Sequence, residues 1–346
     1  MSTTESVRPA RIKDVAARAG VSLKTVTNVV HERPYVADDT RQRVLAAIAD
    51  LDYRPSLVGR QLRGVRSNML TLAVPRVDEP YLGALAHAII AAATVRGYSV
   101  LIDETGGRPS HEREVVEGYP GHGIDGVIFS PLALDPDRLA AASNRTPLVL
   151  LGEQLTDSPA DYVAIDNDGS AREVVRHLLA SGRRRIGFLG GQPRRPTAVG
   201  DLRRRGYEAA LLEAGIAPRL SWQVYAERFT REEGQILADR LIKRVPRLDA
   251  LVCASDLLAI GALRTLRDLG VGVPEDVAVV GWDDIVDGRY CSPSLSTVAP
   301  NLPVLAEQTL DALIRRIEGD RTAGRNVLVP HELVIRESSG GTSLIF

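Results

Sequence analysis

Several features that define other classes of protein are scarce or missing in this sequence. No stretch approaches the ~18 uninterrupted apolar residues that a membrane-spanning helix requires, and the first residues lack the charged-then-apolar order of a signal peptide. The two cysteines, Cys253 and Cys291, and the six histidines show no disulfide or metal-ligand spacing. The sequence therefore predicts a cytoplasmic globular protein with no metal, no cofactor and no membrane partner.

Charge is balanced overall but unevenly distributed. The 346 residues contain 43 Lys and Arg against 44 Asp and Glu, and 44% are hydrophobic, which is typical of a globular protein of two or three domains. The first 68 residues contain 12 Lys and Arg against 7 Asp and Glu, whereas the remainder is acidic. A basic N-terminal part indicates a nucleic-acid partner, although the same charge also fits an ordinary solvated surface.

The basic part has the pattern of three short helices. In residues 11–20 the apolar positions recur at helical spacing, and Gly20 ends the run; these positions are Ile12, Val15, Ala16 and Ala19. Ser22 is placed to cap a second helix at 23–30, whose inward face is Val26, Val29 and Val30. A third helix at 38–51 is expected to bury Val44, Leu45, Ile48 and Leu51. Two helices joined by a tight glycine turn and braced by a third predict a helix-turn-helix.

The outward face of the second helix carries Leu23, Lys24, Thr27 and Asn28. A long apolar side chain, a cation, a hydroxyl and an amide can contact base edges in a major groove. Ser22, Thr25 and Thr27 are predicted to contact phosphates, helped by the helix N-terminus. The alternative is a three-helix bundle without a partner.

These motifs resemble the DNA-binding region of the LacI/GalR family of bacterial transcription repressors. The resemblance runs through DVAARAGVSLKTVTNVVH at 14–31, VADDTRQRV at 36–44 and LDYRP at 51–55. It implies a homodimeric repressor that binds a near-palindromic operator in double-stranded DNA, with His31 also at the DNA. Asn28, where Arg is common in the family, is expected to change base preference only.

Residues 56–64 resemble the family's hinge helix. The resemblance implies that Leu62 wedges into the minor groove and that Arg60 contacts DNA. A segment this short, weakened by Gly59, is expected to fold only when two copies pack together on DNA.

Beyond residue 68 short apolar runs alternate with amphipathic segments. Expected strands at 70–74, 99–102, 126–129 and 148–151 form one set, and those at 162–165, 185–189, 250–253 and 277–280 form a second. Two sets predict two doubly wound parallel-sheet lobes around a shared cleft, which the resemblance likens to a periplasmic sugar-binding protein. The predicted parts are therefore the helix-turn-helix domain at 1–54, the hinge at 55–67, an N-terminal lobe at 68–166 plus 299–329, and a C-terminal lobe at 167–298 plus 330–346.

The resemblance also implies effector contacts. Arg203 is expected to fork onto ligand oxygens, Asp283 to accept hydroxyl hydrogen bonds, and Phe229 to stack on the ligand. Further candidates are Tyr81, Ser130 and Glu153 from the first lobe, and Ser255 and Asp256 from the second. We expect a sugar or sugar derivative, with a purine-like or other polar metabolite as the alternative.

Other functional classes find little support in the sequence. It contains no dinucleotide fingerprint, P-loop or Gly-x-Ser-x-Gly motif, so we do not expect an enzyme. A binding protein of transport type, exported or not and without DNA function, remains the alternative. In the regulator, an effector in the cleft would rotate the N-terminal lobes and separate the paired hinges, while a ligand that brings the hinges together would act as a corepressor.

Overall fold

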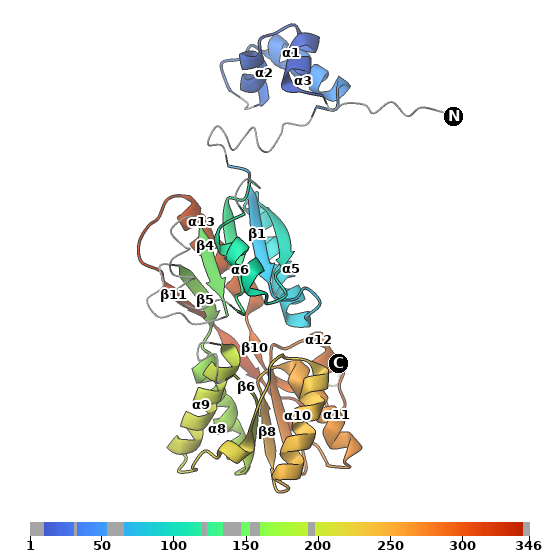
Figure 1. The fold of residues 1–346 in the computed structure, drawn as a ribbon, viewed down its shortest axis with the longest axis vertical. Helices are drawn as coiled ribbons and strands as arrows, with labels where there is room; N and C mark the ends of the chain where they lie inside the picture. Colours follow the sequence, from blue (N-terminus) through green and yellow to red (C-terminus); the bar gives the residue numbers. More distant parts are fainter. Residues whose placement is uncertain are drawn as a thin grey trace, which may run out of the picture. The chain divides into compact units, whose positions relative to one another are not determined.

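The structure is a computed structural model, and it describes residues 10–30, 33–53, 66–119, 123–133, 147–152, 160–192 and 198–341. The chain divides into two compact units (Figure 1). The head comprises Met1–Ser67 and includes Gly121–Gly123, and the body comprises Asn68–Pro120 and Ile124–Phe346. Each unit has its own hydrophobic core.

The head contains the three predicted helices, α1 (Ile12–Ala19), α2 (Leu23–Val30) and α3 (Asp38–Asp50). Gly20 ends α1 in the left-handed conformation at φ 65°, and the backbone N–H of Val21 returns to the carbonyl of Ala16. The Ser22 hydroxyl then caps α2 by accepting the backbone N–H of Thr25 at 3.1 Å. The glycine turn and the serine cap thus determine where one helix ends and the next begins.

The prediction that Leu45 belongs to the core of the head is wrong. Leu45 is 47% exposed, while Val44 and Ala47 are buried. Ile48 and Leu51 pack partly against the core. The inward stripe of α3 is therefore narrower than its apolar residues suggested, with Val44 and Ala47 as its buried members.

The body contains two six-stranded sheets (Figure 1). The first has the order β11-β5-β4-β3-β1-β2, and all of its pairs are parallel. Its strands are β1 (Met69–Val74), β2 (Ser99–Glu104), β3 (Gly126–Phe129), β4 (Leu148–Leu151), β5 (Asp161–Ile165) and β11 (Asn326–Val329). Helices α5 (Pro80–Val95), α6 (Pro109–Val116) and α13 (Leu302–Ile317) cover it. Buried apolar residues on both faces of the central strands hold these layers together.

The second sheet has the order β12-β10-β9-β8-β6-β7. Its strands are β6 (Ile186–Gly191), β7 (Gln223–Tyr225), β8 (Ala250–Cys253), β9 (Ala278–Trp282), β10 (Ser296–Pro300) and β12 (His331–Val334). The helices of this lobe are α8 (Asn167–Ala180), α9 (Val199–Glu213), α10 (Arg231–Arg244), α11 (Asp256–Asp268) and the short α12 (Val286–Arg289), with 3-10 turns at Leu220–Trp222 and Glu337–Ser339. The fold class, a helical head plus two parallel-sheet lobes, is confirmed.

The sheets differ from the sequence prediction in two respects. The strand at 161–165 belongs to the first sheet, not to the second set, since it pairs with β4 and β11. The short strands β7, β10, β11 and β12 were not predicted, and β12 runs antiparallel to β10. Most of these strands lie at sheet edges, where half-exposed residues give no continuous apolar run.

The chain crosses between the two sheets at Asp166, Asn301 and Pro330. Asp166 caps α8 by accepting the Gly169 backbone N–H at 2.8 Å, and Asn301 caps α13 through Val304 at 3.1 Å. Asn301 also donates its own backbone N–H to the Pro330 carbonyl at 3.1 Å. The lobes are thus discontinuous in sequence, and β10 extends the second lobe through Pro300 rather than to residue 298.

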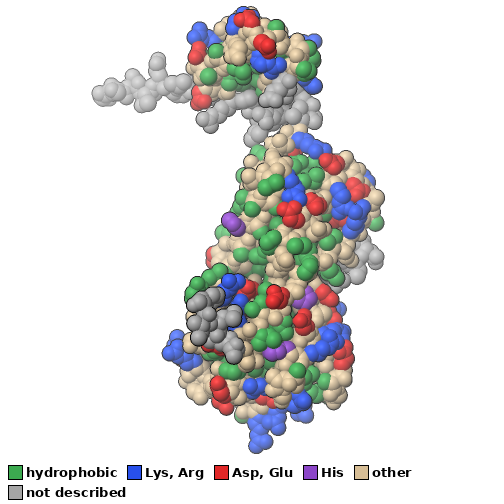
Figure 2. Space-filling view, turned by 180° about the vertical axis from the view of Figure 1, so that it is seen from behind, with side chains coloured by type: hydrophobic (Ala, Val, Ile, Leu, Met, Phe, Trp, Pro, Cys, Tyr) green, Lys and Arg blue, Asp and Glu red, His purple; other side chains and the backbone are tan. Residues whose placement is uncertain are grey.

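The body surface seen in Figure 2 intersperses basic and acidic side chains without a continuous field of one sign. Many are paired, as in the Arg172–Glu213 and Arg264–Asp268 contacts. None of the helices in the described residues has the length and apolar character to cross a bilayer.

Helices α10 and α11 approach closely at Gly234 and Gly261, and substitution of a glycine tests this contact. A Cβ added at Gly261 would lie 2.1 Å from the Arg231 carbonyl oxygen, and backbone cannot move aside cheaply. We expect Gly261→Ala to lower the free energy of unfolding by about 1–3 kcal/mol. Gly83→Ala in α5, where the nearest atom would be 3.9 Å away, should raise it by about 0.5–1 kcal/mol. Urea unfolding followed by circular dichroism measures both free energies. If Gly261→Ala and Gly83→Ala changed the free energy of unfolding in the same direction, the close packing at Gly261 would be contradicted.

Candidate functional sites

Helix α2 presents a mixed apolar and polar surface. Leu23 is 51% exposed and Lys24 is exposed beside it, while Thr27 and Asn28 are partly exposed one turn further on. Val26 and Val29 are buried on the opposite side. The helix therefore packs by one face and offers the other, as a recognition helix does.

The N-terminus of α2 gathers hydroxyl groups. Ser22 and Thr25 lie within 2.9 Å of one another through their hydroxyl oxygens, and the helix N-terminus attracts anions. This arrangement suits a phosphate of the DNA backbone. His31, Arg60 and Leu62, also predicted at the DNA, lie outside the described residues.

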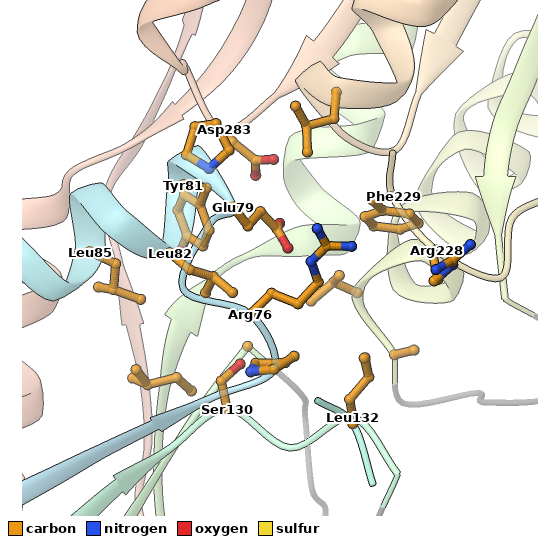
Figure 3. Close-up of a pocket in the computed structure, with 18 of the residues that line it drawn as sticks. Arg76, Glu79, Tyr81, Leu82, Leu85, Ser130, Leu132, Arg228, Phe229 and Asp283 are labelled. Carbon is orange, nitrogen blue, oxygen red and sulfur yellow. The ribbon is translucent and has the colours of Figure 1, made fainter. Parts of the chain in front are cut away.

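The body encloses a cavity of about 740 Å³ between its two sheets. Its walls come from the carboxyl ends of strands and the segments that follow them, in both lobes. In Figure 3, Tyr81, Glu79 and Asp283 lie on one side of the cavity, and Phe229 and Arg228 lie on another. This volume suits a small ligand of up to drug size.

Arg203 is the buried cation of the cavity, with 6% of its surface exposed. Its Nε donates to Asn167 Oδ1 at 2.9 Å and its Nη1 to the Ala254 carbonyl at 2.5 Å. The guanidinium lies 5.2 Å from the Trp282 ring centroid, and Nη1 lies 3.9 Å from Asp283 Oδ1. Burial lowers its pKa and Asp283 opposes that change. These contacts hold the guanidinium group in place. Its Nη2 has no hydrogen-bond partner among the described residues.

Asp283 enters the cavity from a strained turn after β9. Asp283 and Asp284 have φ values of 108° and 48°, in the left-handed region that costs a residue other than glycine about 1–3 kcal/mol. The pKa of Asp283 is raised to about 7, because burial and the charge of Glu79 raise it more than Arg203 and a hydrogen bond at the Asp256 backbone lower it. A carboxyl group with such a pKa is poised to gain or lose a proton as its surroundings change.

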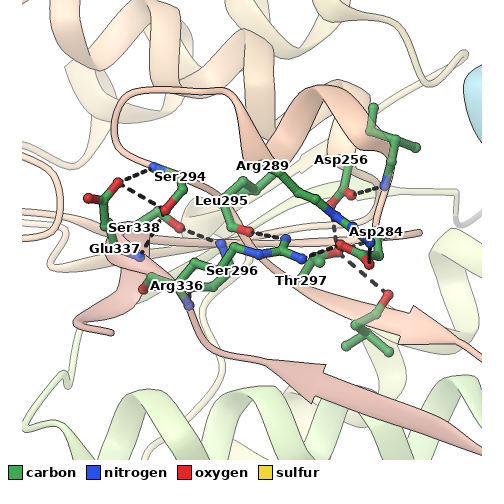
Figure 4. Close-up of polar contacts among 12 residues, drawn as sticks. Asp256, Asp284, Arg289, Ser294, Leu295, Ser296, Thr297, Arg336, Glu337 and Ser338 are labelled. Carbon is green, nitrogen blue, oxygen red and sulfur yellow. Dashed lines mark hydrogen bonds and ion pairs between the residues drawn. The ribbon is translucent and has the colours of Figure 1, made fainter. Parts of the chain in front are cut away.

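A polar network, which is buried at Asp256 and Thr297, holds that turn (Figure 4). Arg289 and Arg336 donate to the two carboxylate oxygens of Asp284 at 2.7 and 2.5 Å. Asp256 accepts the Thr297 hydroxyl at 2.7 Å and the Ile285 backbone N–H at 3.0 Å. The network joins α11, α12, β10 and the segment after β12, so residues distant in sequence place Asp283.

Glu79 lies opposite, at the start of α5. Its carboxylate does not cap that helix. The pKa of Glu79 is raised to about 7, mainly by burial. The charge of Asp78 also raises this pKa, whereas Arg76 and Arg203 lower it. Tyr81, two residues further along the chain, has a pKa raised by burial and by the neighbouring Asp283. Two carboxyl groups from different lobes therefore act on one another across the cavity.

The structure brings together most of the predicted effector residues, since Tyr81, Ser130, Arg203, Phe229 and Asp283 all line the cavity. It does not place Ser255 and Asp256 there. The Ser255 hydroxyl caps α11 by accepting the Leu258 N–H, and Asp256 is fully buried in the polar network. Glu153 lies outside the described residues.

Sequence reasoning missed Arg76, Glu79, Asn167 and Gln192, all of which line the cavity. A signal existed for the first two, because charged residues directly after a buried parallel strand lie at the ligand-binding edge of the sheet. Gly152 also lines the cavity, and its φ of 83° is a conformation that favours glycine.

Comparisons with known proteins agree with this arrangement. Residues 11–56 match the model "Bacterial regulatory proteins, lacI family", and 175–339 match "Periplasmic binding protein-like domain". The transcriptional repressor PurR of Mannheimia succiniciproducens is 30% identical over 95% of this chain and 98% of its own. A lac repressor dimer bound to operator and the anti-inducer ONPF is 27% identical with a TM-score of 0.83, covering 96% of this chain and 99% of that one. The regulator CelR in complex with cellobiose is 30% identical with a TM-score of 0.71, covering 95% and 99%.

The raised pKa values of Glu79 and Asp283 predict how stability depends on pH. A carboxyl group whose pKa rises on folding stabilises the protein below its unfolded pKa, and this stability is lost as pH rises through the folded value. Between about pH 5 and pH 8, therefore, Glu79→Gln and Asp283→Asn should each become more stabilising relative to the parent, by about 1–3 kcal/mol at the upper end.

Tryptophan fluorescence during urea unfolding measures this in the body, where both tryptophans, Trp222 and Trp282, lie. Glu307→Gln is the matched control, because Arg96 lowers the pKa of Glu307 and its titration is therefore complete below this pH range, so its difference from the parent should stay constant. A difference between Glu79→Gln and the parent that stays constant across this pH range would contradict the prediction.

Proposed function

Because this chain belongs to the LacI family of bacterial regulatory proteins, which are DNA-binding transcriptional regulators, we propose that it is a homodimeric repressor controlled by a small polar effector. The observation that carries the proposal is the cavity, where a buried arginine fork, opposing carboxyl groups and an aromatic ring converge. Such a set orients a ligand that offers several hydrogen-bonding groups on a compact frame.

We assign the effector to the sugars or sugar derivatives. Asp283 and Glu79 can each accept hydrogen bonds from hydroxyl groups, Arg203 Nη2 can donate to a ring or hydroxyl oxygen, and Phe229 offers a face for the apolar side of a sugar ring. The solved complex of CelR with cellobiose supports this assignment by similarity.

DNA recognition is assigned to the head. Leu23, Lys24, Thr27 and Asn28 on α2 would read base edges, with Ser22 and Thr25 on phosphate. Two heads related by twofold symmetry would require a near-palindromic operator. The lac repressor dimer solved on its operator supports this arrangement by similarity.

The effector would control the head by changing how the two lobes of the body relate. A ligand can shift an equilibrium between two arrangements only if it binds one of them better, typically by about 1–3 kcal/mol. The cavity draws residues from both lobes, so its occupant contacts each of them. Operator affinity measured with and without ligand then distinguishes an inducer from a corepressor.

Lys24 provides a test of the DNA surface. In a duplex chosen by selection from a random library, Lys24→Ala should weaken binding by about tenfold, because an exposed cation of the recognition helix is lost. If Lys24 contacts a phosphate, the salt dependence should also fall by about one ion. Lys243→Ala in α10, an equal change of charge on the body, is the control. Equal losses from both variants in fluorescence anisotropy would contradict the assignment of α2.

Arg203 provides a test of the effector site. A thermal-shift screen of the full chain against sugars, sugar phosphates and nucleobases identifies a ligand, since a compound that binds the native state stabilises it. For that ligand, Arg203→Lys should raise Kd by about 10–100-fold, because lysine keeps the charge but loses the planar fork. Arg205→Lys, on the exposed side of the same helix, should leave Kd unchanged. A hit among nucleobases, with sugars silent, would replace the sugar assignment.

A further inference from the structure

The charges deep in the cavity do not balance. Glu79 from the first lobe and Asp283 from the second are acidic, and Arg203 is the buried cation that acts on both. Each carboxyl group has its pKa raised by burial, and the negative charge of Glu79 raises that of Asp283. A buried charge that lacks a partner is costly, so this part of the cavity favours an additional positive charge.

The neighbouring arginine does not supply that charge. Arg76 is engaged by Asp78 through two hydrogen bonds, at 2.8 and 2.6 Å. Its side chain is 46% exposed, so water screens its action on Glu79. Arg76 therefore pairs with Asp78, and it offsets the charge of Glu79 only in part and without an ion pair.

The hydrogen bonding of the same groups is also incomplete. The Glu79 carboxylate makes no hydrogen bond or ion pair with another described residue, and the nearest cation to Asp283 is 3.9 Å away. Arg203, which is 6% exposed and lines the cavity, has Nη2 without an acceptor in the described part of the chain. Acceptors from two lobes and one donor therefore await groups on a ligand.

We propose that the effector is a polyhydroxylated compound with a protonated amine, and that this ammonium group lies between Glu79 and Asp283. The inference rests on the proposed function of the cavity as the effector site. An ammonium group brings three N–H donors and a positive charge, so it can bind one carboxylate of each lobe at once. Arg203 Nη2 then donates to a hydroxyl or ring oxygen of the same molecule.

The position between Glu79 and Asp283 disfavours other ligand charges. A hydroxyl group in place of the amine can donate to only one carboxylate and leaves the excess negative charge in place. A phosphate or carboxylate there would face Glu79 and Asp283 directly, and Arg203 already serves Asn167, Ala254 and Asp283. Arg228 and Arg231 also line the cavity, and Arg228 lies beside Phe229 on the other side. The inference therefore separates amino sugars from both neutral sugars and sugar phosphates.

Three disaccharides that differ at one position of each ring test the proposal. Cellobiose has a hydroxyl there, the glucosamine disaccharide obtained from chitosan has an amine, and N,N′-diacetylchitobiose has a neutral amide. Calorimetric titration of the full chain near pH 7.5, where Glu79 and Asp283 are more than half ionised, should show the amine form binding at least about tenfold more tightly than the other two. Its affinity should fall towards pH 5, as Glu79 and Asp283 take up protons and lose their attraction for the ammonium.

Glu79→Gln should remove most of this preference, by about fivefold or more, while retaining the size and shape of the side chain. Glu232→Gln at the rim is the matched control, since Glu232 lines the cavity but is exposed, and it should leave the preference intact. Loss of preference in both variants would point to general attraction by acidic residues and overturn the assignment to Glu79.

The remaining outcomes separate this inference from the proposed function. If cellobiose or the acetylated form binds as tightly as the amine form, the ammonium site is overturned while the cavity stays a sugar site. Binding of sugar phosphates in place of all three disaccharides likewise overturns it and leaves a small-molecule effector. If no sugar, amine or phosphate compound binds and operator affinity responds to none of them, both proposals fail.

Discussion

The burial of one guanidinium, that of Arg203, governs how the second lobe is built around its cavity. A buried cation must be bound on several sides, and here the partners come from the start of α8, from the residue after β8 and from the end of β9. These points meet because the carboxyl ends of parallel strands lie along one edge of the sheet. The strand order and the placement of a single charge are therefore parts of one arrangement.

The acidic side of the cavity depends on a different kind of support. Asp283 reaches the cavity through two consecutive residues in the left-handed region, a conformation that neighbouring contacts must stabilise. Those contacts include Arg336 beyond the last strand and Asp256 at the start of α11. Asp256 in turn has room because Gly281 lacks a Cβ, which would lie 2.2 Å from its carboxylate. The Asp283 carboxyl group in the cavity thus rests on residues that do not themselves line it.

The sequence predicts the parts of this molecule in which local signals agree. Helix α2 begins and ends where its serine cap and apolar period indicate, and the central strands appear as apolar runs because both of their faces are buried. The edge strands lack such runs. Ser255 and Asp256 are predicted to contact the effector because they lie in a family motif. Their polar atoms instead cap a helix and join a buried hydrogen-bond network, so position in a motif does not determine their role. Glu79 could not be assigned because its significance depends on a carboxyl group of the other lobe.

That dependence between lobes also explains how such a cavity can regulate DNA binding. Had the second lobe alone supplied every charged contact, a ligand could bind there without affecting the first lobe. Instead Glu79 and Asp283 act on one another across the cavity, so an occupant that relieves their repulsion stabilises one arrangement of the lobes over others. Because a ligand shifts an equilibrium only by the difference in its affinity for the two states, the opposed carboxyl groups are where that difference would arise. In the proposed mechanism, the imbalance that selects the ligand would therefore also supply the free energy for its effect.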